Sequence, residues 1–248
     1  LLFWTEGSES TPITNSETIH CVGELSGDFQ CHKRRVETMT EVYGHKKALA
    51  YLEQLESANP AITKDCHQLS HAIGNISARH SNNISDAFVD GSYLCFSGYY
   101  HGVVEEMVRA MGEQQFSKDL NLLCAPLQTK GEHNFDYFNC VHGLGHGVMS
   151  LTRNDLKRSL LLCEGLSDDW EKESCYGGVF MEQIMASYRG HYTTMLREDD
   201  LLYPCNIMEG KYKSSCYAYQ AGYAFDMLGG DVVATFSLCA DVEPGYRH

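Results

Sequence analysis

The segment CVHGLGHGVM at residues 140–149 sets the pattern from which the fold of this chain can be predicted. It begins with cysteine, carries glycine and apolar residues, and places His142 and His146 four residues apart. Side chains with this spacing lie on one face of an α-helix. The segment therefore predicts a cysteine-led helix with two imidazoles on one face.

Four other segments resemble this one, and we call all five the A segments. They read CHQLSHAIG (66–74), CFSGYYHGVVEEM (95–107), CVHGLGHGVM (140–149), CYGGVFMEQI (175–184) and CYAYQAGYAF (216–225). The distances between their first residues fall in the range of helical-hairpin repeats. We therefore expect five helices at related positions of a repeated unit.

Several A segments are followed by a second apolar run that ends in cysteine, which we call a B segment. The B segments are DLNLLC (119–124), DLKRSLLLC (155–163), DDLLYPC (199–205) and DVVATFSLC (231–239). Aspartate at the start of such a run favours a helix N-terminus. Each B segment is therefore predicted to be the second helix of a hairpin.

These patterns predict an all-α fold of disulfide-stapled helical-hairpin repeats. Residues 45–57 add an amphipathic helix. The array resembles an α-solenoid of the tetratricopeptide or Sel1 type, although the signature residues of those families are not found. We expect an irregular N-terminal arm over residues 1–32 and the repeat domain over 33–248. A non-repetitive, disulfide-rich helical bundle is the structural alternative.

The eleven cysteines contain no CxxC pair, which argues against zinc ribbons, thioredoxin-like sites and haem attachment. In antiparallel hairpins the end of a B segment lies beside the start of the next A segment, where a disulfide can form. The predicted pairs are Cys124–Cys140, Cys163–Cys175 and Cys205–Cys216, and by elimination Cys66–Cys95 and Cys21–Cys31. Cys239 remains, and its partner is expected just past His248, so that the repeat domain would continue there.

This cysteine usage predicts an oxidising compartment, either extracellular or periplasmic-like. The triplets that begin at Asn75 and Asn83 are glycosylation sequons and suggest a glycoprotein. The first four residues, LLFW, are too few for a membrane span but are compatible with the end of an anchor upstream. The net charge of −14, without a basic run, argues against nucleic acid and anionic membranes as partners.

Histidines recur at one position of successive A segments, and this recurrence predicts a metal site. Neutral imidazole binds zinc and copper, and ligands from several helices can share one ion. The predicted ligands are His67, His71, His101, His142 and His146. If the ion keeps an open position for water, Glu105 and Glu182 are the candidate catalytic proton acceptors, with Glu106 as a further choice.

The sequence thus predicts a secreted or cell-surface helical-repeat protein with a histidine-rich zinc or copper site, acting as a metalloenzyme or a metal-handling subunit. The alternative is a non-catalytic interaction scaffold or complex subunit that binds another protein on its concave face. In that case the histidines only pack between helices, because Gly102 and Gly147 directly follow two of them and allow close approach. No HExxH or GxSxG motif assigns a reaction.

Overall fold

A computed structural model of the chain describes residue 21 and residues 27–129, 134–188 and 195–247. This part contains ten α-helices and no β-strand. The helices are α1 (Phe29–Tyr43), α2 (His45–Ala58), α3 (Cys66–Arg79), α4 (Ile84–Phe88), α5 (Leu94–Leu123), α6 (Phe135–Thr152), α7 (Leu156–Cys163), α8 (Asp169–Tyr188), α9 (Gly210–Met227) and α10 (Val232–Leu238). Short 3-10 turns lie at Pro60–Ile62, Ala125–Leu127, Cys205–Ile207 and Pro244–Tyr246. The predicted all-α class is confirmed.

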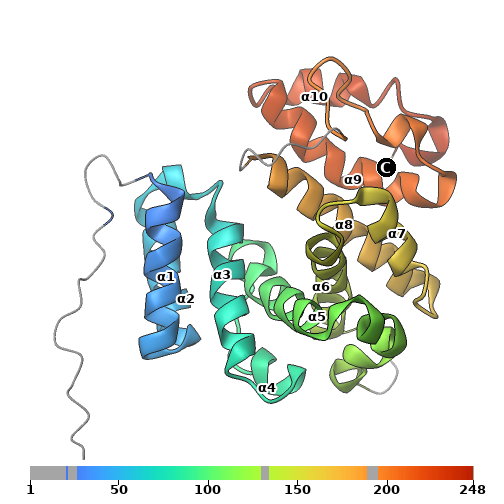
Figure 1. Ribbon diagram of the computed structural model, residues 1–248. Helices are drawn as coiled ribbons and strands as arrows, with labels where there is room; N and C mark the ends of the chain where they lie inside the picture. Colours follow the sequence, from blue (N-terminus) through green and yellow to red (C-terminus); the bar gives the residue numbers. More distant parts are fainter. Residues whose placement is uncertain (1–20, 22–26, 130–133, 189–194, 248) are drawn as a thin grey trace, which may run out of the picture.

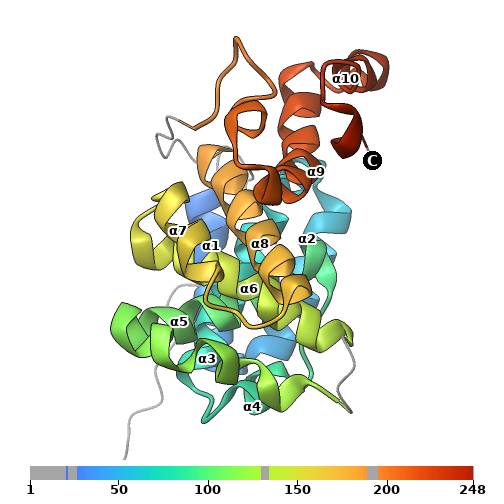
Figure 2. The same ribbon diagram turned by 90° about the vertical axis from the view of Figure 1, so that its right-hand side faces the viewer.

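The five A segments form or lie within α3, α5, α6, α8 and α9, except that Cys95, Phe96 and Ser97 at the start of the second segment have left-handed backbone angles. These helices pack in chain order. Helix α3 contacts α5, α5 contacts α6, α6 contacts α8, and α8 contacts α9. Figures 1 and 2 show the chain passing from α1 and α2 at one end to α9 and α10 at the other. Their apolar faces build the core, in which Leu69, Val104, Leu144 and Val179 are fully buried.

Local sequence explains where several helices begin and end. Aspartate or asparagine side chains accept a hydrogen bond from the first turn, as Asn134 does in α6 and Asp155 in α7. Within α5 the positive φ of Gly112 breaks the helix, so the B segment 119–124 lies in its second half. The predicted helix over 45–57 is confirmed as α2.

One predicted B helix is wrong. Residues 199–205 form bends and turns, and the 3-10 turn Cys205–Ile207 follows. Pro204 explains this, since the residue before a proline is disfavoured in the α conformation and proline has no amide hydrogen to donate. The Tyr203–Pro204 peptide bond is cis. The other three B segments end α5 or form α7 and α10.

All five predicted disulfides are confirmed. The bonded pairs are Cys21–Cys31, Cys66–Cys95, Cys124–Cys140, Cys163–Cys175 and Cys205–Cys216, with Cα–Cα distances from 5.5 to 5.9 Å. Cys239 is a free, exposed cysteine. Five disulfides fit an oxidising compartment.

Three further expectations from the sequence concern the N-terminal arm, the glycosylation sequons and membrane-spanning segments. The expected boundary after residue 32 falls inside α1, which begins at Phe29; the arm before residue 27 lies outside the described residues apart from Cys21. The sequon residue Asn83 is an exposed N-cap, whereas Asn75 lies within α3 with its side-chain oxygen buried. Among the described helices none has the length and apolar character needed to cross a membrane.

Candidate metal centre

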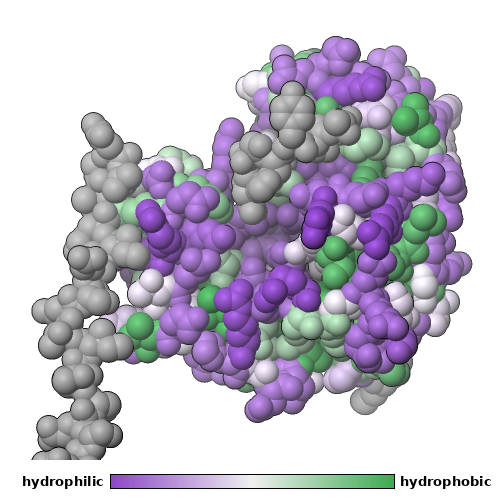
Figure 3. Space-filling view, in the orientation of Figure 1, coloured by the Kyte–Doolittle hydropathy of each residue, from purple (hydrophilic) through white to green (hydrophobic). Residues whose placement is uncertain are grey.

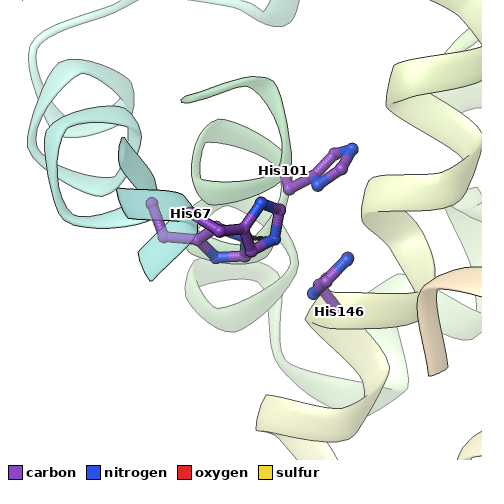
Figure 4. A group of neighbouring side chains, drawn as sticks. His67, His101 and His146 are labelled. Atoms are coloured by element: carbon purple, nitrogen blue, oxygen red, sulfur yellow. Dashed lines mark hydrogen bonds between the residues drawn. The ribbon is translucent and has the colours of Figure 1, made fainter. Parts of the chain in front are cut away.

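Four of the five predicted histidine ligands meet in the space between α3, α5 and α6. His67 and His71 come from α3, His101 from α5 and His146 from α6, and each side chain is at most 3% exposed. One nitrogen of each ring lies within 4.8 Å of one nitrogen of every other. Figure 4 shows the rings of His67, His101 and His146 directed into the same space.

Glycines bring these helices close enough for the rings to meet. A Cβ added to Gly98 or Gly102 of α5 would lie 2.4 Å from the carbonyl oxygen of His67 or 2.2 Å from that of His71. Such distances are far inside van der Waals contact, so only glycine fits there. On α6, a Cβ added to Gly147 would lie 2.7 Å from the Cβ of Val108 on α5. The close packing expected from the glycines is therefore present around the histidines.

Hydrogen bonds fix three of the four rings through their Nδ1 atoms. His67 Nδ1 donates to the carbonyl oxygen of Cys95 at 2.7 Å. His71 Nδ1 donates to Glu105 Oε2 at 3.1 Å, and His146 Nδ1 donates to Glu182 Oε2 at 2.9 Å. Carbonyl and carboxylate oxygens only accept, so each Nδ1 carries the hydrogen and each neutral ring has its lone pair on Nε2.

The Nε2 atoms of the two α3 histidines then face each other. His67 Nε2 lies 3.0 Å from His71 Nε2. His146 Nε2 and both ring nitrogens of His101 are buried and have no hydrogen-bond partner. A buried polar atom without a partner costs about 1–3 kcal/mol. A cation bound by these lone pairs would satisfy His146 Nε2 and one nitrogen of His101, and it would remove the repulsion between the two facing Nε2 atoms.

The surroundings favour the neutral form of His101 and His146, which is the form that binds a metal ion. Burial, reinforced by the neighbouring histidines, lowers the pKa of His101 well below its usual value. Burial also lowers the pKa of His146, although its hydrogen bond to Glu182 acts in the opposite direction. The desolvation of His142 lowers its pKa to about 3.

The fifth predicted ligand, His142, lies beside the cluster and is not one of the four. Its ring is buried, and its centroid lies 4.8 Å from that of His101 and 5.2 Å from that of His146. Its Nδ1 lies 3.5 Å from the hydroxyl of Tyr219. His133 and His191, which the pattern leaves outside the A segments, lie outside the described residues.

The predicted acidic residues have different partners. Glu105 and Glu182 orient histidines, and their side chains remain 23% and 16% exposed at the edge of the cluster. Glu106 is held by Arg79 and Arg109; although desolvation acts to raise its pKa, the hydrogen bonds and charges of these two ion pairs lower it. Glu106 is therefore engaged elsewhere, while Glu105 and Glu182 belong to the cluster.

Sequence reasoning missed two partners of the cluster. The carbonyl oxygen of Cys95 anchors His67, and Gln68 Nε2 approaches Glu182 Oε2 at 3.5 Å. A backbone acceptor leaves no trace in a sequence pattern. Gln68 and Glu182 are far apart in the chain, and no spacing rule connects them.

Comparison with known proteins does not assign this site to a family. No model of a protein family, no curated protein and no solved structure matches the chain. The chemistry of the site therefore rests on its own geometry.

Proposed function

We propose that the protein binds one zinc or copper ion through His67, His71, His101 and His146. The supporting observation is the convergence of the rings: one nitrogen of each lies within 4.8 Å of one nitrogen of every other, and carboxylates and a carbonyl accept hydrogen bonds from Nδ1 of three of them. Metal-binding histidines characteristically donate their second ring hydrogen to such acceptors. Two nitrogens on one tetrahedral zinc ion lie about 3.3 Å apart, near the 3.0 Å between the two Nε2 atoms of α3.

The donor set favours metal handling or structural stabilisation over catalysis. Four imidazoles complete the tetrahedral coordination of zinc, whereas catalytic zinc sites keep one position for water. Glu105 and Glu182 would act as proton acceptors only if one histidine left the ion. Imidazole also suits copper, and the five disulfides leave Cys239 as the only cysteine thiol in the chain. We include His142 in the same proposal as a further metal ligand, since its ring lies beside those of His101 and His146.

The setting we propose is a secreted or cell-surface protein built from successive helical hairpins over residues 33–248. The disulfides support the oxidising compartment. The order of contacts, α3 to α5 to α6 to α8 to α9, supports a repeat array. In the scaffold alternative the same array binds another protein and its histidines only pack.

Metal analysis of protein purified without nickel-affinity chromatography tests the proposal. Elemental analysis should find about one zinc or copper ion per chain, and removal by a chelator should lower the thermal midpoint, since an ion at 100 times its Kd stabilises by about 2.7 kcal/mol. The His146→Ala variant should lose the ion. Glu182→Gln should retain the fold but weaken metal affinity about 10- to 100-fold.

The matched control is His80→Ala, because His80 is exposed and contacts Glu41 at the surface. It should change neither metal content nor stability. Protein that contains no transition metal, and whose thermal midpoint does not respond to added zinc or copper, would leave the scaffold alternative as the better account.

A further inference from the structure

The hairpin of α9 and α10 matches the hairpin of α6 and α7 residue by residue. At a constant offset along the chain, Cys140 corresponds to Cys216 and Cys163 to Cys239. The N-cap residues correspond too: the side chain of Asp155 accepts a hydrogen bond from the backbone of Arg158, and that of Asp231 from the backbone of Ala234.

The turns between the paired helices are also the same. Arg153 and Asn154 have φ of 59° and 63°, and their counterparts Gly229 and Gly230 have φ of 66° and 81°. The amide of Asn154 donates to the carbonyl of Met149 at 2.8 Å, and that of Gly230 donates to the carbonyl of Phe225 at 2.9 Å. In both hairpins the first helix therefore ends in two residues with left-handed backbone conformation.

The two hairpins differ in what covers them. Helix α7 contacts both α6 and α8, and Leu156 and Leu160 are 4% and 1% exposed. Their counterparts Val232 and Phe236, on α10, are 55% and 71% exposed. The same change occurs on the preceding helix, where Met149 is 1% exposed and Phe225 39%. The face of the molecule shown in Figure 3 is mostly hydrophilic, with scattered hydrophobic patches.

The disulfide bonds identify the helix that covers the first hairpin and is missing from the second. In the first hairpin Cys163 is bonded to Cys175, which begins the A segment in α8, the helix that covers the hairpin. In the second hairpin Cys239 holds the same place but is free and exposed. Beside it lies an apolar cavity of about 270 Å³, lined by residues such as Ala221, Phe236 and Val242. The cavity leaves room for an apolar side chain next to the thiol.

We propose that the face formed by α9 and α10 is the docking surface for an amphipathic helix of a partner protein that carries a cysteine where α8 carries Cys175. The helix packs there as α8 packs on α6 and α7, and its cysteine forms a disulfide with Cys239. The surface continues the series of interfaces that runs from α6 through α8 to α9, and this series defines the occupant: cysteine first, small residues next, and apolar residues at helical spacing.

The covalent step is a thiol–disulfide exchange. The partner's cysteine arrives as a mixed disulfide with a small thiol, and the thiolate of Cys239 attacks its sulfur. The new bond joins the two proteins, and the small thiol leaves as thiolate with the electron pair of the broken bond. The proposal does not depend on the metal site.

A peptide with the sequence of α8, residues 169–188, tests the proposal on the full chain. Its cysteine is activated as the mixed disulfide with 5-thio-2-nitrobenzoate, whose release is followed by absorbance, and mass spectrometry identifies the modified residue. We expect an adduct at Cys239 that forms at least ten times faster than with a scrambled peptide of the same composition and cysteine position.

Two variants separate docking from simple thiol reactivity. Phe236→Asp should abolish the preference for the α8 peptide while its thiol reacts with a small aromatic disulfide at an unchanged rate. Leu161→Asp changes a residue that is also exposed but lies on α7, and it should leave the preference intact. Equal rates with the two peptides would overturn the proposal. So would a dimer linked through Cys239 that excludes the peptide, because the occupant would then be a second copy of this chain. A disulfide from Cys239 to a cysteine just past His248, found in a longer form of the chain, would overturn it too, because the occupant would then be a later segment of the same protein.

Discussion

The hairpin of α6 and α7 and the hairpin of α9 and α10 share a backbone, but they differ in burial and in chemistry. The first carries His142 and His146 and lies between α5 and α8. The second has Gly222 at the position of His146 and leaves Phe236 largely exposed. The aspartate cap and the left-handed turn therefore accompany the same hairpin geometry in both surroundings. The neighbouring helices decide whether it is core or surface.

The same comparison explains why the histidine cluster is confined to one part of the molecule. His146 reaches His67, His71 and His101 because glycines on α5 and α6 let three helices approach. No added atom at Gly222 would meet another within 4 Å. The helical unit is thus common to both hairpins, and the chemistry depends on the residue at one position and on close neighbours.

Truncation at matched positions of α7 and α10 should give the largest difference between the hairpins. Leu160→Ala removes a side chain that is 1% exposed and should cost about 2–5 kcal/mol of unfolding free energy, because a cavity remains. Phe236→Ala, at the counterpart position, should change it by no more than about 0.5 kcal/mol, because the ring is already in solvent. Urea unfolding of the oxidised variants measures both values.

Equal losses in the two variants would break the comparison. They would mean that Phe236 is buried in solution, and a dependence of the loss on protein concentration would then identify self-association as the cause.

A smaller effect should follow from exchanging small residues on the first helix of each hairpin. Gly145 corresponds to Ala221, and a Cβ on Gly145 would lie 2.2 Å from the carbonyl oxygen of Cys175. Gly145→Ala should therefore force α6 from α8 and cost about 1–3 kcal/mol. Ala221→Gly, in the open hairpin, should cost only about 0.5–1 kcal/mol through helix propensity. Thermal unfolding of the two variants compares them directly.

A Gly145→Ala variant as stable as the native chain would contradict the close contact of α6 with α8. Measuring the metal content of the same variant tests whether the displacement of α6 reaches the histidine cluster. Because Gly145 precedes His146, a displaced α6 should also lower metal affinity.

Most of the fold was predictable from sequence because its signals are local. The helices that contain the A segments, the five disulfides and α2 follow from spacing and amphipathic pattern. The predicted starts at cysteine were wrong for α6, α8 and α9, which begin five or six residues before their cysteines. The failure at residues 199–205 is instructive, since the apolar pattern resembled the other B segments and Pro204 overrode it. The exposure of α10 could not be predicted, because Val232 and Phe236 resemble the buried leucines of α7 in hydrophobicity.

The candidate site was predictable in composition and less so in geometry. Periodicity placed five histidines on related helix faces, and four of them converge. That His142 lies beside the cluster depends on how α6 is rotated against α5, which no spacing encodes. The pairing of Glu105 with His71 and of Glu182 with His146 depends likewise on the contacts between helices.

The helix caps should give the smallest effect, and the two hairpins should respond equally. Asp155 and Asp231 are both exposed, and each accepts a hydrogen bond from a backbone amide three residues later, at 3.0 and 2.9 Å. Either Asp→Ala change should cost about 1 kcal/mol, because it leaves that amide without its acceptor. Asp→Asn keeps an acceptor and serves as the control, since it should cost much less. Urea unfolding of the four variants tests whether the caps act locally. If only Asp155→Ala destabilised the protein, α10 would add little to the cooperative unit, and the likeness of the hairpins would end at their geometry.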